Sequence, residues 1–328
     1  MVTLPWLSSQ LATLRAAHAA GRLGHALLIH EAPGAGGEWL ARWVTQLVLC
    51  ERGESAPCGL CPACSRVSAG QHPDVIRVGF LEESRQLRIE QVRQLSEELA
   101  LTSHQGGFKV GVVSPADALN RFAANALLKT LEEPPPRTLL LLVVTQPSRL
   151  PPTILSRCQR IRVRAPQRAE AMEWLTASVG KADWGGVLDV LGNAPLTAAA
   201  ADPALVVQVN KETRQALDEA LAGRLDPTAT AERWARAEPA LHLRCFENWL
   251  TECIAQKSGA APFLTELRAV PYLPQAQNVL NIRRLFELLD AVRELKSELD
   301  MPINRGLALE ALLRSLQSSD SQGWRNAG

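Results

Sequence analysis

One stretch of the chain, residues 123–158, constrains the fold more than any other part of the sequence. It opens with apolar residues spaced i, i+3, i+4 and i+7, which share one face of a helix; they are Ala124, Leu127, Leu128 and Leu131. Prolines 134–136 end this helix, because proline lacks the amide donor and restricts the residue before it. The following segment, 138–145, is apolar without polar alternation, which is typical of a strand buried on both faces of a parallel sheet.

The same stretch ends in Ser156-Arg157-Cys158, followed by a second β-like run. NALLKTLEEPP, then a buried strand, then SRC resembles the AAA+ clamp-loader family of DNA replication. This resemblance implies that Arg157 is offered in trans, as an arginine finger, to the ATP site of a neighbouring subunit, with Ser156 and Cys158 supporting the motif. A guanidinium suits that role because it stays charged and donates in several directions to phosphate oxygens. The alternative is that Arg157 only pairs with a carboxylate on a helix surface.

A glycine-rich loop, 31–37, lies between an apolar run at 25–30 and an amphipathic helical pattern, which is the context of a phosphate-binding P-loop. That motif needs a lysine for the β- and γ-phosphates and a Ser or Thr hydroxyl for Mg²⁺. This loop keeps its glycines but has a carboxylate and an indole at those two positions; the residues are Gly34, Gly36, Gly37, Glu38 and Trp39. A carboxylate would repel a triphosphate and an indole cannot ligate magnesium. The sequence therefore predicts a degenerate P-loop that does not bind ATP productively.

Two further positions depart from the nucleotide-hydrolysing members of the family. Their third strand ends in Asp-Glu, where this chain has Ser114 and Pro115, and the nearest carboxylate, Asp117, is displaced by two positions. Their second sensing arginine corresponds here to Pro195. With the altered P-loop, these differences predict a subunit that does not hydrolyse ATP.

Four cysteines lie at metal-ligand spacing, C-x₇-C-x₂-C-x₂-C; they are Cys50, Cys58, Cys61 and Cys64. Two overlapping CxxC turns can place thiolates around one tetrahedral ion, and the longer excursion lets the fourth thiolate return. Zinc is the expected occupant, in a structural role, because four protein ligands leave no open position. An iron–sulfur cluster is the chemical alternative, and unrelated buried or redox-active cysteines are the other.

Composition excludes several classes of protein. The chain has 328 residues, 46% of them hydrophobic and 21% charged, which is ordinary for a globular protein with a sizeable core. A net charge of +1 gives no general attraction to nucleic acid. No apolar run approaches the ~18 residues of a membrane span, and the N-terminal pattern is not that of a signal peptide. Seven cysteines argue against a secreted disulfide framework, so the cytoplasm is the expected location.

The chain is expected to be α/β followed by all-α. The resemblance implies an AAA+ module with a Rossmann-like parallel sheet and the zinc insertion at 1–166, a small helical lid at 167–205 and a helical collar for oligomerisation at 206–328. The collar would include a closing segment at 302–310. Within it, His242, Cys245 and Cys253 are interpreted as core residues rather than metal ligands.

An intact SRC motif beside a broken nucleotide site implies a non-hydrolysing subunit of the DNA polymerase III clamp loader. Its implied partners are the gamma/tau motor subunits, the delta subunit and, through the complex, the sliding clamp and primer-template DNA. Two alternatives stay open: an active AAA+ ATPase of the same type, which Glu38 and Pro115 oppose, and a zinc-dependent DNA-binding scaffold. The latter lacks the basic, aromatic surface that such binding needs, since no aromatic residue lies between Cys50 and Cys64.

Overall fold

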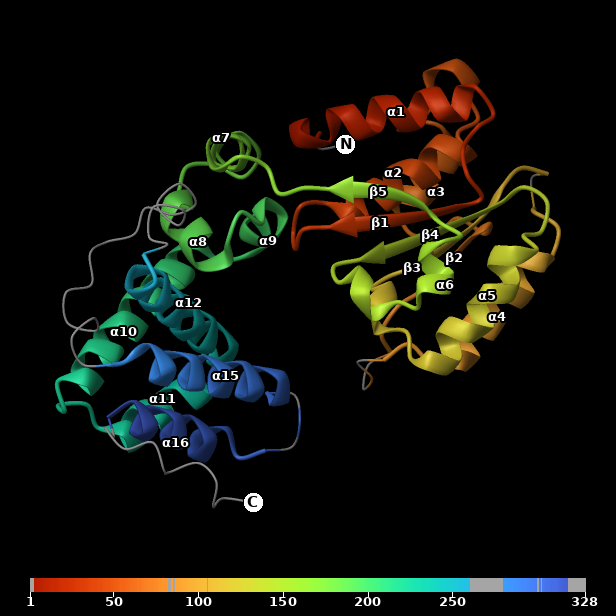
Figure 1. The fold of residues 1–328 in the computed structure, drawn as a ribbon. Helices are drawn as coiled ribbons and strands as arrows, with labels where there is room; N and C mark the ends of the chain where they lie inside the picture. The colour runs from red at the N-terminus through yellow and green to blue at the C-terminus, as the bar shows by residue number, and fades with distance from the viewer. Residues whose placement is uncertain are drawn as a thin grey trace. The chain divides into compact units, whose positions relative to one another are not determined.

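A computed structural model describes residues 3–81, 84, 86–104, 106–259, 280–299, 301 and 303–317. Its contacts divide the chain into two compact units, Met1–Glu170 and Ala171–Gly328 (Figure 1). The first unit is α/β and the described part of the second is helical. This order of classes agrees with the prediction from the sequence.

The first unit is built on a five-stranded parallel sheet with the strand order β2-β3-β4-β1-β5. The strands are β1 (Ala26–Glu31), β2 (Val75–Val78), β3 (Lys109–Val113), β4 (Thr138–Val144) and β5 (Gln159–Val163). Strand β4 is central, with β1 on one side and β3 on the other, and every one of its residues is buried. Its position explains why its sequence is apolar without alternation.

Helices cover both faces of this sheet (Figure 1). They are η1 (Pro5–Leu7), α1 (Ser8–Ala19), α2 (Gly37–Leu49), η2 (Gly53–Ser55), α3 (Pro62–Ser68), α4 (Ile89–Ala100), η3 (Ala116–Ala118), α5 (Arg121–Glu132), η4 (Pro147–Arg149) and α6 (Pro152–Leu155). Helices α4, α5 and α6 share a core with Leu28 and Leu142 of the sheet. Helix α2 packs on β1 and β4.

Helix α5 shows how local sequence sets an element that carries part of the site. The side chain of Asn120 accepts a hydrogen bond from the Ala123 amide and so caps the start of the helix. Ala124, Leu127 and Leu131 are buried in the shared core, and Leu128 is half-buried, as the predicted helix face requires. The helix ends at Glu132, close to the three prolines.

The second unit is helical wherever the structure describes it. Its helices are α7 (Arg168–Ser178, which begins at the boundary), α8 (Trp184–Leu191), α9 (Pro195–Ala200), α10 (Pro203–Leu221), α11 (Pro227–Arg236), α12 (Pro239–Lys257), α15 (Ile282–Glu298) and α16 (Arg305–Gln317). Trp234, Phe246 and Trp249 form the aromatic part of a core that α15 and α16 complete with leucines. Pro302, in the predicted closing segment, lies outside the described residues.

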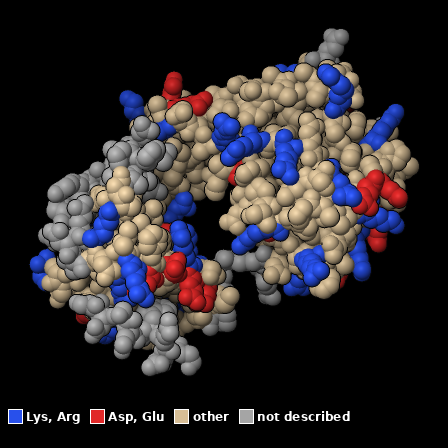
Figure 2. All heavy atoms as spheres, in the orientation of Figure 1, with Lys and Arg blue, Asp and Glu red and all other residues tan. Residues whose placement is uncertain are grey.

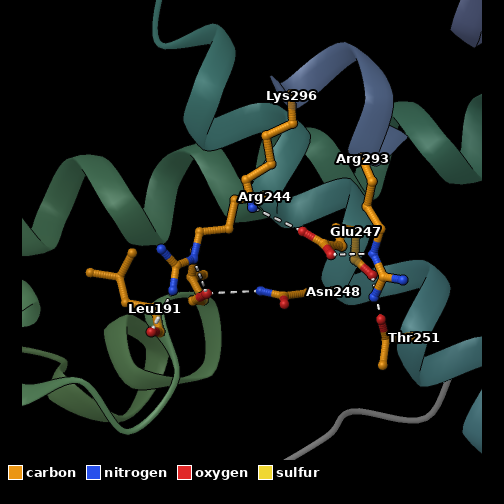
Figure 3. Close-up of polar contacts among 8 residues, drawn as sticks. Leu191, Arg244, Glu247, Asn248, Thr251, Arg293 and Lys296 are labelled. Atoms are coloured by element: carbon orange, nitrogen blue, oxygen red, sulfur yellow. Dashed lines mark hydrogen bonds and ion pairs between the residues drawn. The ribbon is translucent and has the colours of Figure 1, made fainter. Parts of the chain in front are cut away.

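A polar network joins the predicted lid helices to the predicted collar (Figure 3). On α12, Arg244 donates to the carbonyls of Val190 (3.1 Å) and Leu191 (2.6 Å) at the end of α8, and Asn248 also donates to Val190 (2.8 Å). The last carbonyls of a helix have no partner within the helix, so these side chains satisfy them. One turn away, Glu247 bonds Arg293 and Lys296 of α15; these two contacts are both 2.9 Å. The two segments thus belong to one compact unit, and a separate boundary near residue 205 stays a prediction.

In the described ranges, none of the helices combines the length and the apolar character that crossing a membrane requires.

Candidate functional site

Arg157 lies between α6 and β5, where several acceptors hold its side chain. Its Nη1 donates to the carbonyl of Thr153 (3.0 Å) and to Oγ of Ser156 (3.3 Å). Its Nη2 lies 2.7 Å from Oε1 of Glu132, the last residue of α5. The pairing with a carboxylate that was considered as an alternative to the finger role is therefore present. This ion pair with Glu132 engages only the Nη2 atom of the guanidinium.

A guanidinium carries five N–H donors in a planar fork. Nη1 of Arg157 donates two hydrogen bonds and Nη2 forms the ion pair with Glu132, so the Nε–H group donates to none of the described residues. The side chain is 36% exposed. The arginine is thus held in place and still offers donors to an external anion.

The other two residues of the SRC motif have different surroundings. The Ser156 hydroxyl donates to the carbonyl of Thr153 (3.1 Å), so it serves local structure as well as Arg157. Cys158 is buried in the core that α4, α5 and α6 share with the sheet. Burial raises the pKa of its thiol to about 11, although the positive charge of Arg160 acts to lower it. A thiol with that pKa is an inert core group at neutral pH. Cys158 therefore supports the motif by packing.

In the glycine-rich loop, which the sequence predicts to be a degenerate P-loop, the backbone amides donate to a carboxyl group of the chain itself. Gly36 has a φ of 108°, in the left-handed region that favours glycine. Oε2 of Glu31, at the end of β1, accepts hydrogen bonds from the amides of Gly37 (2.6 Å) and Gly36 (3.2 Å) at the start of α2. A Cβ atom on Gly37 would lie only 2.7 Å from Cδ of Glu31. The carboxyl group of Glu31 thus occupies the amides at the start of α2, which is where a helix would otherwise bind an anion.

The sequence pattern does not predict a role for the side chain of Glu31. Burial raises the pKa of its carboxyl group, and the two backbone amides partly oppose this by stabilising the anion. The available signal was a carboxylate directly before the loop, at the end of a strand that aims it at the helix N-terminus. Glu38, which was selected, is exposed and pairs weakly with Arg77 at 3.7 Å. Trp39 is half-buried.

The segment after β3 carries one carboxylate, Asp117, which joins two loops. Ser114 and Pro115 follow β3 and supply no carboxylate. The nearby carboxylate of Asp117 accepts hydrogen bonds from the amide (3.2 Å) and hydroxyl (2.9 Å) of Thr145 and from the amide of Gln146 (2.8 Å). Asp117 therefore ties the loop after β4 to the loop after β3.

The four cysteines predicted as metal ligands lie together. Their Sγ atoms are all within 4.8 Å of one another; they belong to Cys50, Cys58, Cys61 and Cys64. Four sulfurs around zinc at ~2.3 Å would be about 3.8 Å apart, so the cluster can hold such an ion. Cys50 follows α2, and Cys61 caps the start of α3, which also carries Cys64. The spacing read from the sequence therefore brings all four ligands to one point.

Backbone amides surround this sulfur cluster. The amide of Cys58 points to Sγ of Cys50 (3.5 Å), that of Cys61 to Cys58 (3.3 Å) and that of Cys64 to Cys61 (3.4 Å). The amides of Leu60 and Cys61 lower the pKa of Cys58 to about 6. N–H groups directed at the Cys58 sulfur favour its thiolate, which is the form that binds a metal, whereas burial raises the pKa of the Cys64 thiol.

On one face of the molecule, charged side chains follow no single pattern. On the face shown in Figure 2, Lys and Arg side chains of the described residues form small separate groups. This distribution agrees with the net charge of +1 and does not resemble a continuous nucleic-acid surface.

Comparison with known proteins shows to which family the chain belongs. A family model described as "DNA polymerase III, delta subunit" matches residues 6–167, and one described as "DNA polymerase III, delta subunit, C terminal" matches residues 208–318. The DNA polymerase III subunit delta' of Pseudomonas aeruginosa is 37% identical over 253 residues, which cover 75% of each chain. That of Yersinia pestis is 30% identical over 330 residues, or 97% of this chain and 96% of its own.

A solved structure supports the fold. A DNA polymerase III gamma subunit-related protein from Thermotoga maritima matches with a TM-score of 0.54 at 18% identity, covering 94% of this chain and 98% of its own. The five-stranded parallel sheet and the helical second unit thus share the fold of this solved structure, and the two family models place the chain in the class of DNA polymerase III subunits. The chain belongs to the family of delta' subunits of DNA polymerase III, and it is a clamp-loader component in DNA replication.

Proposed function

We propose that this subunit does not hydrolyse ATP and that it supplies Arg157 to the ATP site of a neighbouring motor subunit, gamma or tau, while the sliding clamp is loaded onto primed DNA. The delta subunit would be a further partner in the clamp-loader complex. We expect this chain to be located in the cytoplasm. The observation that carries this proposal is the state of Arg157, which is anchored by three acceptors but keeps free N–H donors.

The proposal that the chain's own site is silent rests on three independent features. Glu31 fills the loop amides that would bind phosphate. Glu38 stands where a P-loop lysine would neutralise the triphosphate, and Ser114 and Pro115 replace the acidic pair for magnesium and water. Any one of these changes would weaken hydrolysis, and together they remove each of its requirements.

The chemistry proposed for Arg157 is electrostatic. In phosphoryl transfer, negative charge spreads over the equatorial oxygens of the phosphoryl group and on the leaving oxygen. A planar, permanently charged guanidinium can donate two hydrogen bonds to that charge at once. A finger supplied in trans is worth roughly 10³–10⁵ in rate, so the neighbour's site would be nearly silent without it.

We also propose that the four-cysteine cluster holds a structural zinc ion. Four protein sulfurs would complete a tetrahedral site, so no coordination position is left for a substrate or an activated water. The ion would tie the end of α2 to the start of α3 and fix the loop between them.

The test is ATPase activity in a complex reconstituted from this subunit, its motor neighbours, the clamp and primed DNA. Arg157→Ala is expected to remove most of the turnover at the adjacent site, because its transition state loses the cation. Arg162→Ala is the matched control, since Arg162 is an exposed arginine on β5 just beyond the motif. The isolated chain is expected to show no turnover.

Two outcomes would contradict the proposal. Turnover by the isolated chain would mean that the site with Glu31 is active. An unchanged rate for Arg157→Ala, in a complex that assembles normally, would mean that the arginine is only a surface residue.

A further inference from the structure

Glu132 holds the guanidinium of Arg157 from a separate element of the fold. It is the last residue of α5, 25 positions before Arg157 (157 − 132), and its Oε1 lies 2.7 Å from Nη2. The other two acceptors, Thr153 and Ser156, belong to the segment that carries the arginine itself. Glu132 is thus the contact that fixes Arg157 relative to the body of the sheet domain.

Helix α5 gives this contact a firm base. Ala124, Leu127 and Leu131 are buried in the core shared with the sheet, and Thr130 exchanges a hydrogen bond of 2.9 Å with Ser96 of α4. The arginine side chain has four rotatable bonds of its own and would otherwise sample many rotamers. A carboxylate on a packed helix limits that sampling.

The contact leaves the arginine available to a second anion. Glu132 forms an ion pair with Nη2 and the two local acceptors take hydrogen bonds from Nη1, so Nε–H donates to none of the described residues. A phosphate oxygen can therefore approach without displacing Glu132. This arrangement indicates that Glu132 supports Arg157 and does not compete with the phosphate for it.

We infer that Glu132 is a positioning residue for the finger: it orients Arg157 so that the remaining donors meet the nucleotide of the neighbouring subunit. The inference rests on the proposed function. It predicts that loss of Glu132 lowers the neighbour's catalytic rate while its affinity for ATP changes little, because a finger acts chiefly in the transition state.

The chain provides a matched control in the next residue. Glu133 is a carboxylate of the same length at the same helix end, and it is exposed like Glu132. Its backbone amide bonds the carbonyl of Lys129, but no side-chain contact of Glu133 occurs among the described residues. Glu133→Ala therefore makes the same change in net charge and helix composition without touching Arg157.

The experiment measures kcat and KM for ATP in the reconstituted complex, with assembly checked by size-exclusion chromatography. Glu132→Ala is expected to lower kcat on the order of 10-fold, less than Arg157→Ala, because a displaced group retains part of its effect. Glu132→Gln keeps an acceptor oxygen without the charge and is expected to fall between Glu132→Ala and the wild type. Glu133→Ala is expected to match the wild type. In the Arg157→Ala background, Glu132→Ala is expected to cause no further loss.

Each contrary result has a distinct meaning. If Arg157→Ala is strongly impaired while Glu132→Ala matches the wild type, the positioning role is wrong and the finger stands. If Glu132→Ala raises the rate, the carboxylate competes with phosphate, which also overturns the inference. A further loss in the Arg157→Ala background would indicate a general structural role instead. If Arg157→Ala itself has no effect, the proposed function and this inference fall together.

Discussion

At the scale of single residues, the pKa of His242 is changed by its burial in the helical core. Its ring stacks on Trp234 with centroids 4.5 Å apart, and its Nδ1 lies 2.8 Å from the hydroxyl of Thr213. Burial lowers the pKa of His242 from 6.5 to about 4, with Glu212 opposing and Arg233 assisting. The imidazole is therefore neutral at physiological pH and belongs to the core, as interpreted from the sequence.

This pKa predicts that the second unit loses stability in mild acid. The unfolded histidine takes up a proton as the pH falls through 6.5, whereas the folded one resists until about pH 4, so protonation favours unfolding between these values. At pH 5 this group should cost about 2 kcal/mol. Urea unfolding at pH 7 and pH 5 measures the change in the free energy of unfolding between these values. The change should be smaller in His242→Gln than in the wild type. An unchanged pH dependence in the variant would assign the effect to other groups.

The contacts of two carboxyl groups, Glu31 and Glu132, could not be predicted from the sequence. Glu132 lies inside the motif that carries the resemblance, yet its contact with Arg157 depends on how α5 and the SRC segment pack. Glu31 meets Gly36 and Gly37 only because β1 ends beneath the loop. By contrast, the cysteine spacing alone predicted a cluster, because CxxC turns bring their own ligands together.

At the scale of elements, the cysteine cluster joins α2 to α3, and its proposed zinc predicts a local effect. Cys58→Ser is expected to lower bound zinc from about one ion per chain to near zero, because a hydroxyl is a poor substitute for a thiolate. Hydrogen exchange should increase at residues 50–68 and stay unchanged in the sheet. Metal analysis and exchange mass spectrometry measure both effects.

The control for that prediction is Cys245→Ala. Cys245 is buried in α12 of the second unit, whereas the cluster belongs to the first unit, and burial raises the pKa of Cys245 to about 12. This variant should keep its zinc even if the helical unit becomes less stable. Full zinc content in Cys58→Ser would show that the cluster does not bind the ion as proposed.

The elements themselves were predictable because their patterns are strong. The apolar runs gave β1, β4 and β5, and the spacing of apolar residues gave α5 to within a few positions. What the patterns could not give was the contact of α12 with the end of α8. Arg244 and Val190 are 54 residues apart, and nothing local marks either of them as the other's partner.

At the scale of the whole molecule, that same contact joins the predicted lid and collar segments into one unit. Arg244 and Asn248 satisfy carbonyls of Val190 and Leu191 that would otherwise be left without partners. The double substitution Arg244→Ala, Asn248→Ala is expected to destabilise the second unit by roughly 2–4 kcal/mol, since each lost partner costs about 1–3 kcal/mol when the remaining group is buried. Urea denaturation measures the change.

Arg236→Ala is the matched control for this whole-unit effect. Arg236 is 81% exposed and pairs with Glu232 one turn earlier on α11, an interaction worth little. Equal stability of the double variant and this control would mean that the polar network does not hold α8 to α12.

The carboxylate of Glu31 has one more consequence for the molecule as a whole. The loop amides of Gly36 and Gly37 are satisfied by a group that the chain always carries. If the site is silent as proposed, the geometry of these amides would not depend on the cellular ratio of ATP to ADP. Under the proposed function, information about the energy state of the cell would reach this subunit only from its neighbours, through whatever touches Arg157. The side it presents to the next subunit would then stay constant when metabolism fluctuates.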